Sequence, residues 1–188
     1  MKYLKEQLEK TLKDNNMKVF SHELNIVGVR NNYNLTDSFE EVLYVWNDKI
    51  PFQEFKITTK PGKYWWQNFG KKEGVAALVE GQYLNTWKLG LHKGVYEALI
   101  QIKDVIVYRD NNKDSVLDRK ITQKGLFGIN IHRASHKWLS KFVDKWSAGC
   151  QVFADPKEYN VFINILKANH QREYSYTLLN DFLVKKSN

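Results

Sequence analysis

The sequence predicts a β-rich α+β domain, a sandwich or barrel with one helix before it and one helix after its only cysteine. Short β-prone runs fill most of the chain between residues 24 and 153, and Asn, Asp, Gly and Pro residues separate them. Apolar residues recur with helical spacing at both ends of the chain. No internal repeat or linker interrupts the 188 residues. We therefore expect one domain, with an N-terminal helix over 1–16, a core over 24–153, and a C-terminal helix and tail over 154–188.

The composition is that of a globular protein. Hydrophobic residues make up 43% of the chain and charged residues 27%, which excludes a disordered chain and a collagen-like repeat. No apolar stretch reaches the ~18 residues that a membrane-spanning helix needs. With 29 Lys and Arg residues against 21 Asp and Glu residues, the formal net charge is +8. This charge favours nucleic acid, anionic lipid or anionic cell wall as a neighbour, but a Lys-rich solubilising surface would give the same value.

The first helix is predicted by leucines at Leu4, Leu8 and Leu12, and it should end near Asn15. β-prone runs follow, with turn residues such as Pro61 between them. The runs expected to form strands are 24–30, 43–46, 54–58, 75–79, 105–108, 127–132 and, as a last strand, 174–179.

The second helix should begin after residue 155. Asp155 is a suitable N-cap, Pro156 suits the first helical position, and Glu158 is placed to close a capping box. An apolar stripe then indicates packing on the sheet, and its members are Val161, Phe162, Ile165 and Leu166.

The candidate catalytic residues are concentrated between residues 125 and 153. The expected strand ends at His132, a loop follows, and Cys150 comes after Gly149 at a turn into a Gln-Val-Phe run. A cysteine attacks as its thiolate, and a neighbouring imidazole lowers the thiol pKa by stabilising the ion pair. The backbone N–H groups of Gly149 and Cys150 are candidates for an oxyanion hole. A lone cysteine is more often a buried structural residue, so His132 and Cys150 by themselves leave both interpretations open.

A longer pattern adds to this pair. His132 follows Ile131, fourteen residues intervene, and Ser147-x-Gly149-Cys150 comes next. This arrangement resembles the signature of the L,D-transpeptidase (YkuD-like) family, and residues 58–64 resemble the Thr-Pro-x-Gly-x-Phe/Tyr turn of the same enzymes. The resemblance implies that Cys150 is a nucleophile acting on the tripeptide–D-alanine bond of peptidoglycan stem peptides and that His132 is its base. Gly149 and Ser147 fall on the Gly and Ser/Thr of the motif.

The chain departs from that family at two positions. Ala148 stands where the motif has His, and Val152 stands where it has Arg or Asn. Ala148 removes a polar contact to the substrate, and Val152 removes a partner for the substrate carboxylate. Arg133 or Arg109 could provide a partner for that carboxylate instead. The differences indicate a divergent branch of the family and leave hydrolysis and crosslinking open.

Several other residues are candidates for substrate binding. His92 and Tyr96 lie in a Gly-flanked segment that is either a loop at the groove or a hairpin tip with an exposed imidazole. Tyr64 and Trp66 belong to an aromatic run that could line a platform for sugar rings or peptide stems, with part of the run in the core. Arg133 follows the expected base directly.

The sequence predicts neither a metal nor a cofactor. Residues 110–118 resemble a calcium loop, but Ser115 replaces the glycine at loop position 6 and Ile121 replaces the bidentate glutamate at position 12. An Asx-rich turn is therefore expected. Lysines interleaved with aromatics could bind single-stranded nucleic acid, but no helix-turn-helix, zinc or RNA-recognition pattern supports that partner.

The sequence predicts two alternative functions. The first is a cysteine-dependent acyltransferase that acts on stem peptides through a thioester, either as an L,D-transpeptidase or as a carboxypeptidase or endopeptidase. The second is a non-catalytic binding module of the cell wall or a virion. Either would act at the anionic cell wall or in the periplasm as a bacterial or phage product. Because no signal peptide is present, we expect release by lysis, leaderless export or prior removal of a leader.

Overall fold

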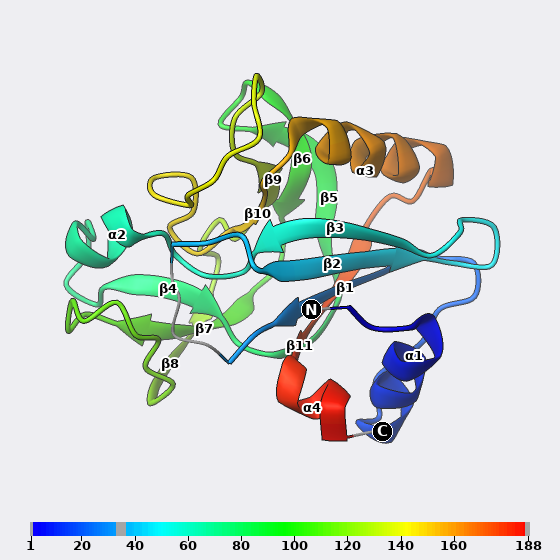
Figure 1. Ribbon diagram of the computed structural model, residues 1–188, viewed down its shortest axis with the longest axis horizontal. Helices are drawn as coiled ribbons and strands as arrows, with labels where there is room; N and C mark the ends of the chain where they lie inside the picture. Colours follow the sequence, from blue (N-terminus) through cyan, green and yellow to red (C-terminus); the bar gives the residue numbers. More distant parts are fainter. Residues whose placement is uncertain (1, 33–36, 187–188) are drawn as a thin grey trace.

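The computed structural model describes residues 2–32 and 37–186, which form a closed eight-stranded barrel and a smaller three-stranded sheet (Figure 1). The barrel strands, in order around it, are β1 (Asn25–Arg30), β11 (Tyr174–Asn180), β5 (Gly81–His92), β6 (Tyr96–Gln101), β9 (Ile131–Arg133), β10 (Gln151–Phe153), β3 (Gln53–Thr58) and β2 (Glu41–Trp46). The smaller sheet contains β4 (Val75–Leu78), β7 (Val105–Asp110) and β8 (Ile121–Gly125), in that order. The predicted β-rich fold class is confirmed.

Four helices flank these sheets in the described part of the chain: α1 (Lys5–Asp14), α2 (Lys63–Gln67), α3 (Pro156–Asn169) and α4 (Asp181–Lys186). Helices α1 and α4 pack together at one end of the barrel, whereas α3 lies at the opposite side of the molecule (Figure 1). The helices expected near the N-terminus and after the cysteine are both present. None of the helices in the described ranges is both long enough and apolar enough to cross a membrane.

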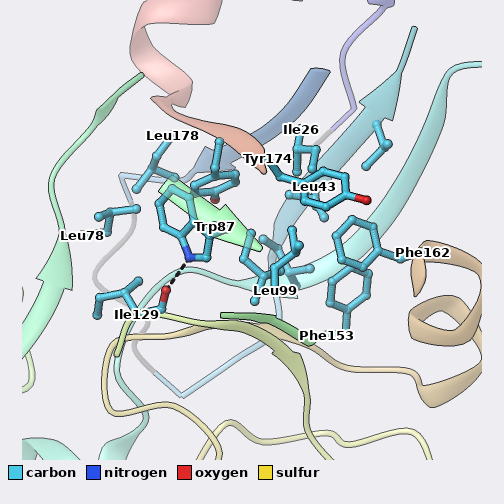
Figure 2. Close-up of a cluster of buried hydrophobic side chains, with 14 of the residues drawn as sticks. Ile26, Leu43, Leu78, Trp87, Leu99, Ile129, Phe153, Phe162, Tyr174 and Leu178 are labelled. Atoms are coloured by element: carbon cyan, nitrogen blue, oxygen red, sulfur yellow. Dashed lines mark hydrogen bonds between the residues drawn. The ribbon is translucent and has the colours of Figure 1, made fainter. Parts of the chain in front are cut away.

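The barrel interior is filled by one large apolar cluster around Trp87, which comes from β5 (Figure 2). Its indole Nε1 donates a hydrogen bond to the carbonyl oxygen of Ile129 at 2.6 Å. Leu99 and Phe153 contribute to the same cluster from β6 and β10. Because interiors are close-packed, this contact fixes the segment before β9 against the barrel wall.

The expected strand over 127–132 is shorter than predicted and becomes β9, which begins only at Ile131. The N–H groups of Phe127 and Ile129 donate to the side-chain carbonyl of Gln101, at 3.2 and 2.8 Å, instead of to a neighbouring strand. Gly128 between them has a φ of 71°, which interrupts an extended run. The alternating apolar residues before Ile131 therefore lie in a loop that is held by the Gln101 side chain, and not in a strand.

The aromatic run at 64–66, which lies outside the expected strands, forms the short helix α2. Two details of α3 differ from the sequence-based expectations. Glu158 accepts a hydrogen bond from the backbone N–H of Lys56 at 3.0 Å and does not close a capping box, although Asp155 caps α3 as predicted. Val161 is exposed because the buried face of α3 is rotated toward Tyr159, Phe162, Ile163 and Leu166.

The long hairpin of β5 and β6 was not predicted from the sequence. Gly81 and Gly90 lie within β5, and Asn85 has a φ of 51°, so this strand contains residues that normally indicate turns. The hairpin pairs antiparallel from Trp87 to Gln101 and ends at His92 and Tyr96. It therefore brings these two residues to the edge of β9.

Candidate functional site

The segments containing His132 and Cys150 are neighbours in the barrel. Strands β9 and β10 pair in parallel, with Gln151 opposite Ile131 and Val152 opposite His132. The backbone N–H of Gln151 donates to the carbonyl oxygen of Asn130 at 3.0 Å. Because paired strands lie about 4.8 Å apart, the chain that follows Cys150 runs next to the strand that carries His132. The two segments on which the family resemblance rests are therefore adjacent in space.

Cys150 is half-buried, and its thiol donates a hydrogen bond to the carbonyl oxygen of Gly128 at 3.3 Å. Among the described residues, no hydrogen bond joins this thiol to the ring of His132. The sulfur must therefore leave the Gly128 carbonyl before it can transfer a proton to the imidazole.

The His132 imidazole is buried, with 4% of the residue exposed. Its Nδ1 lies 2.8 Å from the carbonyl oxygen of Arg133, and the Tyr96 hydroxyl donates to the same oxygen at 3.2 Å. Because a carbonyl oxygen only accepts hydrogen bonds, Nδ1 carries the proton in this arrangement. Nε2 is then the nitrogen of the neutral ring that can take a proton.

A second imidazole packs against the first. The ring of His92 stacks on that of His132 with 4.1 Å between centroids and 22° between planes. His92 is buried, and its Nδ1 accepts from the side-chain amide of Asn130 at 3.1 Å. Arg133 lies over the Tyr96 ring, with its Cζ 4.0 Å from the centroid. Of the two interpretations of His92, the exposed hairpin tip is wrong, since the barrel covers this imidazole.

Burial dominates the electrostatics of the site. It lowers the pKa of His132 to about 3, aided by the neighbouring His92, Lys93 and Arg133, while the bond to the Arg133 carbonyl acts in the opposite direction. It raises the pKa of the Cys150 thiol from 9.0 to about 11, although the Asn130 backbone and the Lys93 charge act to lower it. Both groups are therefore neutral at pH 7. The expected thiolate–imidazolium pair is wrong for the free protein, because both pKa values move away from it.

The turn before the cysteine is built by Ser147 and Gly149. The Ser147 hydroxyl accepts from the Gly149 N–H at 3.1 Å and donates to the carbonyl oxygen of Cys150 at 2.8 Å. Gly149 has a φ of 141°, and a Cβ there would overlap the carbonyl oxygen of Ala76 in β4. Ser147 and Gly149 therefore shape the backbone. The Gly149 N–H already has an acceptor, which leaves the Cys150 N–H as the available donor to an oxyanion.

The second segment of the family resemblance contacts this turn. The N–H of Gly62 donates to the carbonyl oxygen of Ser147 at 2.8 Å, and the Trp65 indole donates to that of Lys145 at 3.0 Å. The Tyr64 ring lies under the Lys145 ammonium group, 4.5 Å from its Nζ. Trp66 is 1% exposed and donates to the Pro61 carbonyl. Trp66 is therefore a core residue, and its predicted place on a substrate platform is wrong.

Asn130 and Lys93 belong to the site but were not predicted from the sequence. The Asn130 side chain accepts from the Gln101 N–H at 3.0 Å and donates to His92, while its backbone lies at the thiol. Its position between two isoleucines gave only a strand signal. Lys93 lies at the hairpin tip with a φ of 51°, and its charge acts on both the thiol and His132.

No family model and no curated protein matches this chain. Within residues 2–32 and 37–186, no group of His, Cys, Asp and Glu side chains could hold a metal ion.

Proposed function

We propose that the protein catalyses cysteine-dependent acyl transfer on peptidoglycan stem peptides, at the cell wall, through a thioester on Cys150. The observation that carries this proposal is the pairing of the strands that follow Cys150 and carry His132, together with an imidazole whose Nδ1 is bonded to the Arg133 carbonyl. A ring held in this tautomer has Nε2 as the nitrogen that can accept a proton. The family resemblance supplies the substrate class.

The chemical step uses this chain's own groups. When the scissile carbonyl of the stem binds over Cys150, the thiol turns from Gly128 and gives its proton to Nε2 of His132 as sulfur attacks the carbonyl carbon. The Cys150 N–H donates to the oxyanion that forms. The intermediate collapses as the C–N bond breaks, and His132 returns the proton to the leaving amine, which leaves a thioester on Cys150. Water then releases an acid, or an amine forms a new crosslink.

The chemical step requires the bound substrate to change the electrostatics of the site. In the free protein the thiol has a pKa of about 11 and the imidazole a pKa of about 3, so proton transfer from Cys150 to His132 is unfavourable. Stabilisation of the developing oxyanion by the Cys150 N–H acts in favour of the transfer only when a carbonyl is bound.

The direct test is incubation of muropeptides with the wild type, Cys150→Ala and His132→Gln, with products followed by mass spectrometry. We expect no product from Cys150→Ala and a loss of about 100-fold or more from His132→Gln. His136→Ala, which changes an exposed imidazole of the same loop, is the matched control and should keep wild-type activity. Equal product from the wild type and Cys150→Ala would refute the proposal.

A second candidate function is a non-catalytic module that binds the cell wall. It is favoured by the thiol's bond to the Gly128 carbonyl and by its raised pKa, both of which suit a structural cysteine. This function predicts that wild type and Cys150→Ala cosediment equally with purified peptidoglycan and that neither releases product. Product that depends on Cys150 would exclude it.

A further inference from the structure

Arg109 on β7 is a buried cation without an anionic partner. Only 9% of the residue is exposed. Its Nε donates to the side-chain carbonyl of Gln123 at 2.8 Å and its Nη1 donates to the carbonyl oxygen of Gly74 at 3.2 Å. Its Cζ lies 5.0 Å from the centroid of the Phe127 ring. All three partners are uncharged, and no carboxylate of the described residues is within ion-pair distance. Buried charges are normally paired, so this arrangement is incomplete.

Arg109 lines a cavity of about 540 Å³ at the edge of β7 and β8. Lys72 adds a second positive charge to its wall, and Thr122 and Gln123 add polar groups. Glu73 also lines the cavity and is exposed. Two cations therefore face one carboxylate that is in contact with solvent, which makes the cavity suited to an anion of limited size.

The free edge of Arg109 has the geometry that a carboxylate requires. A guanidinium has five N–H donors in one plane, and here one N–H of Nε and one of Nη1 are used. Both N–H groups of Nη2 and the second of Nη1 make no hydrogen bond to the described residues. Two parallel N–H groups on this edge can bind both oxygens of a carboxylate, which a lysine cannot do.

The cavity lies close to the Cys150 turn through two contacts. Arg109 pairs with Ala76 across β4 and β7, and the carbonyl of Ala76 contacts Gly149. Phe127, under the guanidinium, precedes the glycine whose carbonyl accepts the Cys150 thiol. With Cα spacings of about 3.8 Å along the chain and about 5 Å across strands, Arg109 and Cys150 lie within about 14 Å, or about four residues of extended peptide.

We propose that the cavity at Arg109 is a carboxylate subsite, in which the guanidinium pairs with a carboxylate of the peptide whose carbonyl binds over Cys150. This inference rests on the proposed function for the identity of the peptide. The cavity, the unpaired guanidinium and its distance from Cys150 stand without it.

The test measures binding in the Cys150→Ala protein, so that no turnover intervenes. A synthetic stem tetrapeptide ending in D-alanine is titrated with its carboxylates free, and again with every carboxylate amidated, while amide signals are followed by NMR. We expect the amidated peptide to bind at least 10-fold more weakly and the free peptide to shift signals of β7 and β8. Arg109→Met should abolish the difference, whereas Arg172→Met, at an exposed arginine, should retain it.

The variants also separate the possible failures. Arg109→Lys keeps the charge but loses the paired donors, so it should lower the ratio at least 3-fold even if Arg109→Met does not fold. Equal binding of both peptides, or loss of the difference on Arg133→Met in place of Arg109→Met, would overturn the subsite. Shifts of β7 and β8 caused by inorganic phosphate but not by the free peptide would overturn it as well. Carboxylate-dependent binding without turnover by the wild type would instead leave the subsite and refute the acyltransferase.

Discussion

Two regions of this molecule bury titratable side chains, and they differ in whether those side chains have partners of opposite charge. In the first, Arg30 is fully buried on β1 and its Nη1 lies 3.1 Å from a carboxylate oxygen of Glu80. Tyr108 donates to the same carboxylate at 2.9 Å, and Arg119 lies 3.6 Å from it. Burial acts to raise the pKa of Glu80, but the Arg30 charge and the hydrogen bonds outweigh it, so the pKa is lowered. This paired region stabilises charged forms.

The second region contains His132, His92 and Cys150 of the candidate site and, in the neighbouring three-stranded sheet, Arg109. Burial moves the pKa values of His132 and Cys150 toward their neutral forms, and no carboxylate acts on either group. No carboxylate of the described residues lies within ion-pair distance of Arg109, whose hydrogen-bond partners are Gln123 and Gly74. Uncompensated burial costs stability, and it is typical of residues that are retained for a ligand or a reaction.

The largest expected difference between the two regions is in stability. Arg30→Met leaves Glu80 without its closest cation and three backbone and hydroxyl acceptors without their donor, so it should lower the free energy of unfolding by about 3–5 kcal/mol. Arg109→Met removes an unpaired buried charge together with two hydrogen bonds, and these effects offset each other to within about 1 kcal/mol. Urea denaturation measures both. Equal losses would mean that Arg109 is as structural as Arg30.

The turn before Cys150 depends on a close backbone contact with β4. Gly149→Ala places a Cβ onto the Ala76 carbonyl at a φ of 141°, so we expect a loss of about 3 kcal/mol from overlap and backbone strain together. Gly94→Ala is the control, because Gly94 has a φ of 71° but open space around it, and strain alone costs about 1 kcal/mol. Thermal and urea unfolding give the two values. A Gly149→Ala protein as stable as Gly94→Ala would show that the β4 contact does not hold the cysteine turn.

The smallest effect concerns the thiol itself. Only the thiolate is alkylated, and a pKa raised from 9.0 to about 11 leaves about 100-fold less thiolate at pH 7. The rate of reaction of Cys150 with iodoacetamide should therefore rise about tenfold per pH unit and level off only near pH 11. Mass spectrometry of the modified chain gives the rate, with free cysteine as the reference. A plateau below pH 8 would show that Cys150 is a thiolate at neutral pH, as in a thiolate–imidazolium pair with His132. This region would then stabilise charged forms, as the region around Arg30 does.

The parts of the site that could be predicted from the sequence are those coded by local spacing. The positions of His132 and Cys150, the turn at Gly149 and the helix capped by Asp155 follow from short patterns, because strand ends, turns and caps are set by neighbouring residues. Trp66 was misplaced because the aromatic run by itself does not show which of its rings enters the core.

By itself, the sequence determined that this chain is β-rich and that it has a helix before the barrel and another after its cysteine. The likeness of the His132–Cys150 spacing to a family of cysteine enzymes stays a prediction. Only the tertiary structure decided that His92 stacks on His132, that the free thiol and imidazole are both neutral, and that Arg109 lines a cavity without a carboxylate partner among the described residues. The physical reason is that a pKa and an unpaired charge depend on everything packed around a group. Those neighbours come from β4, β5, β7 and β9, strands that are distant in the chain and meet only when the two sheets form.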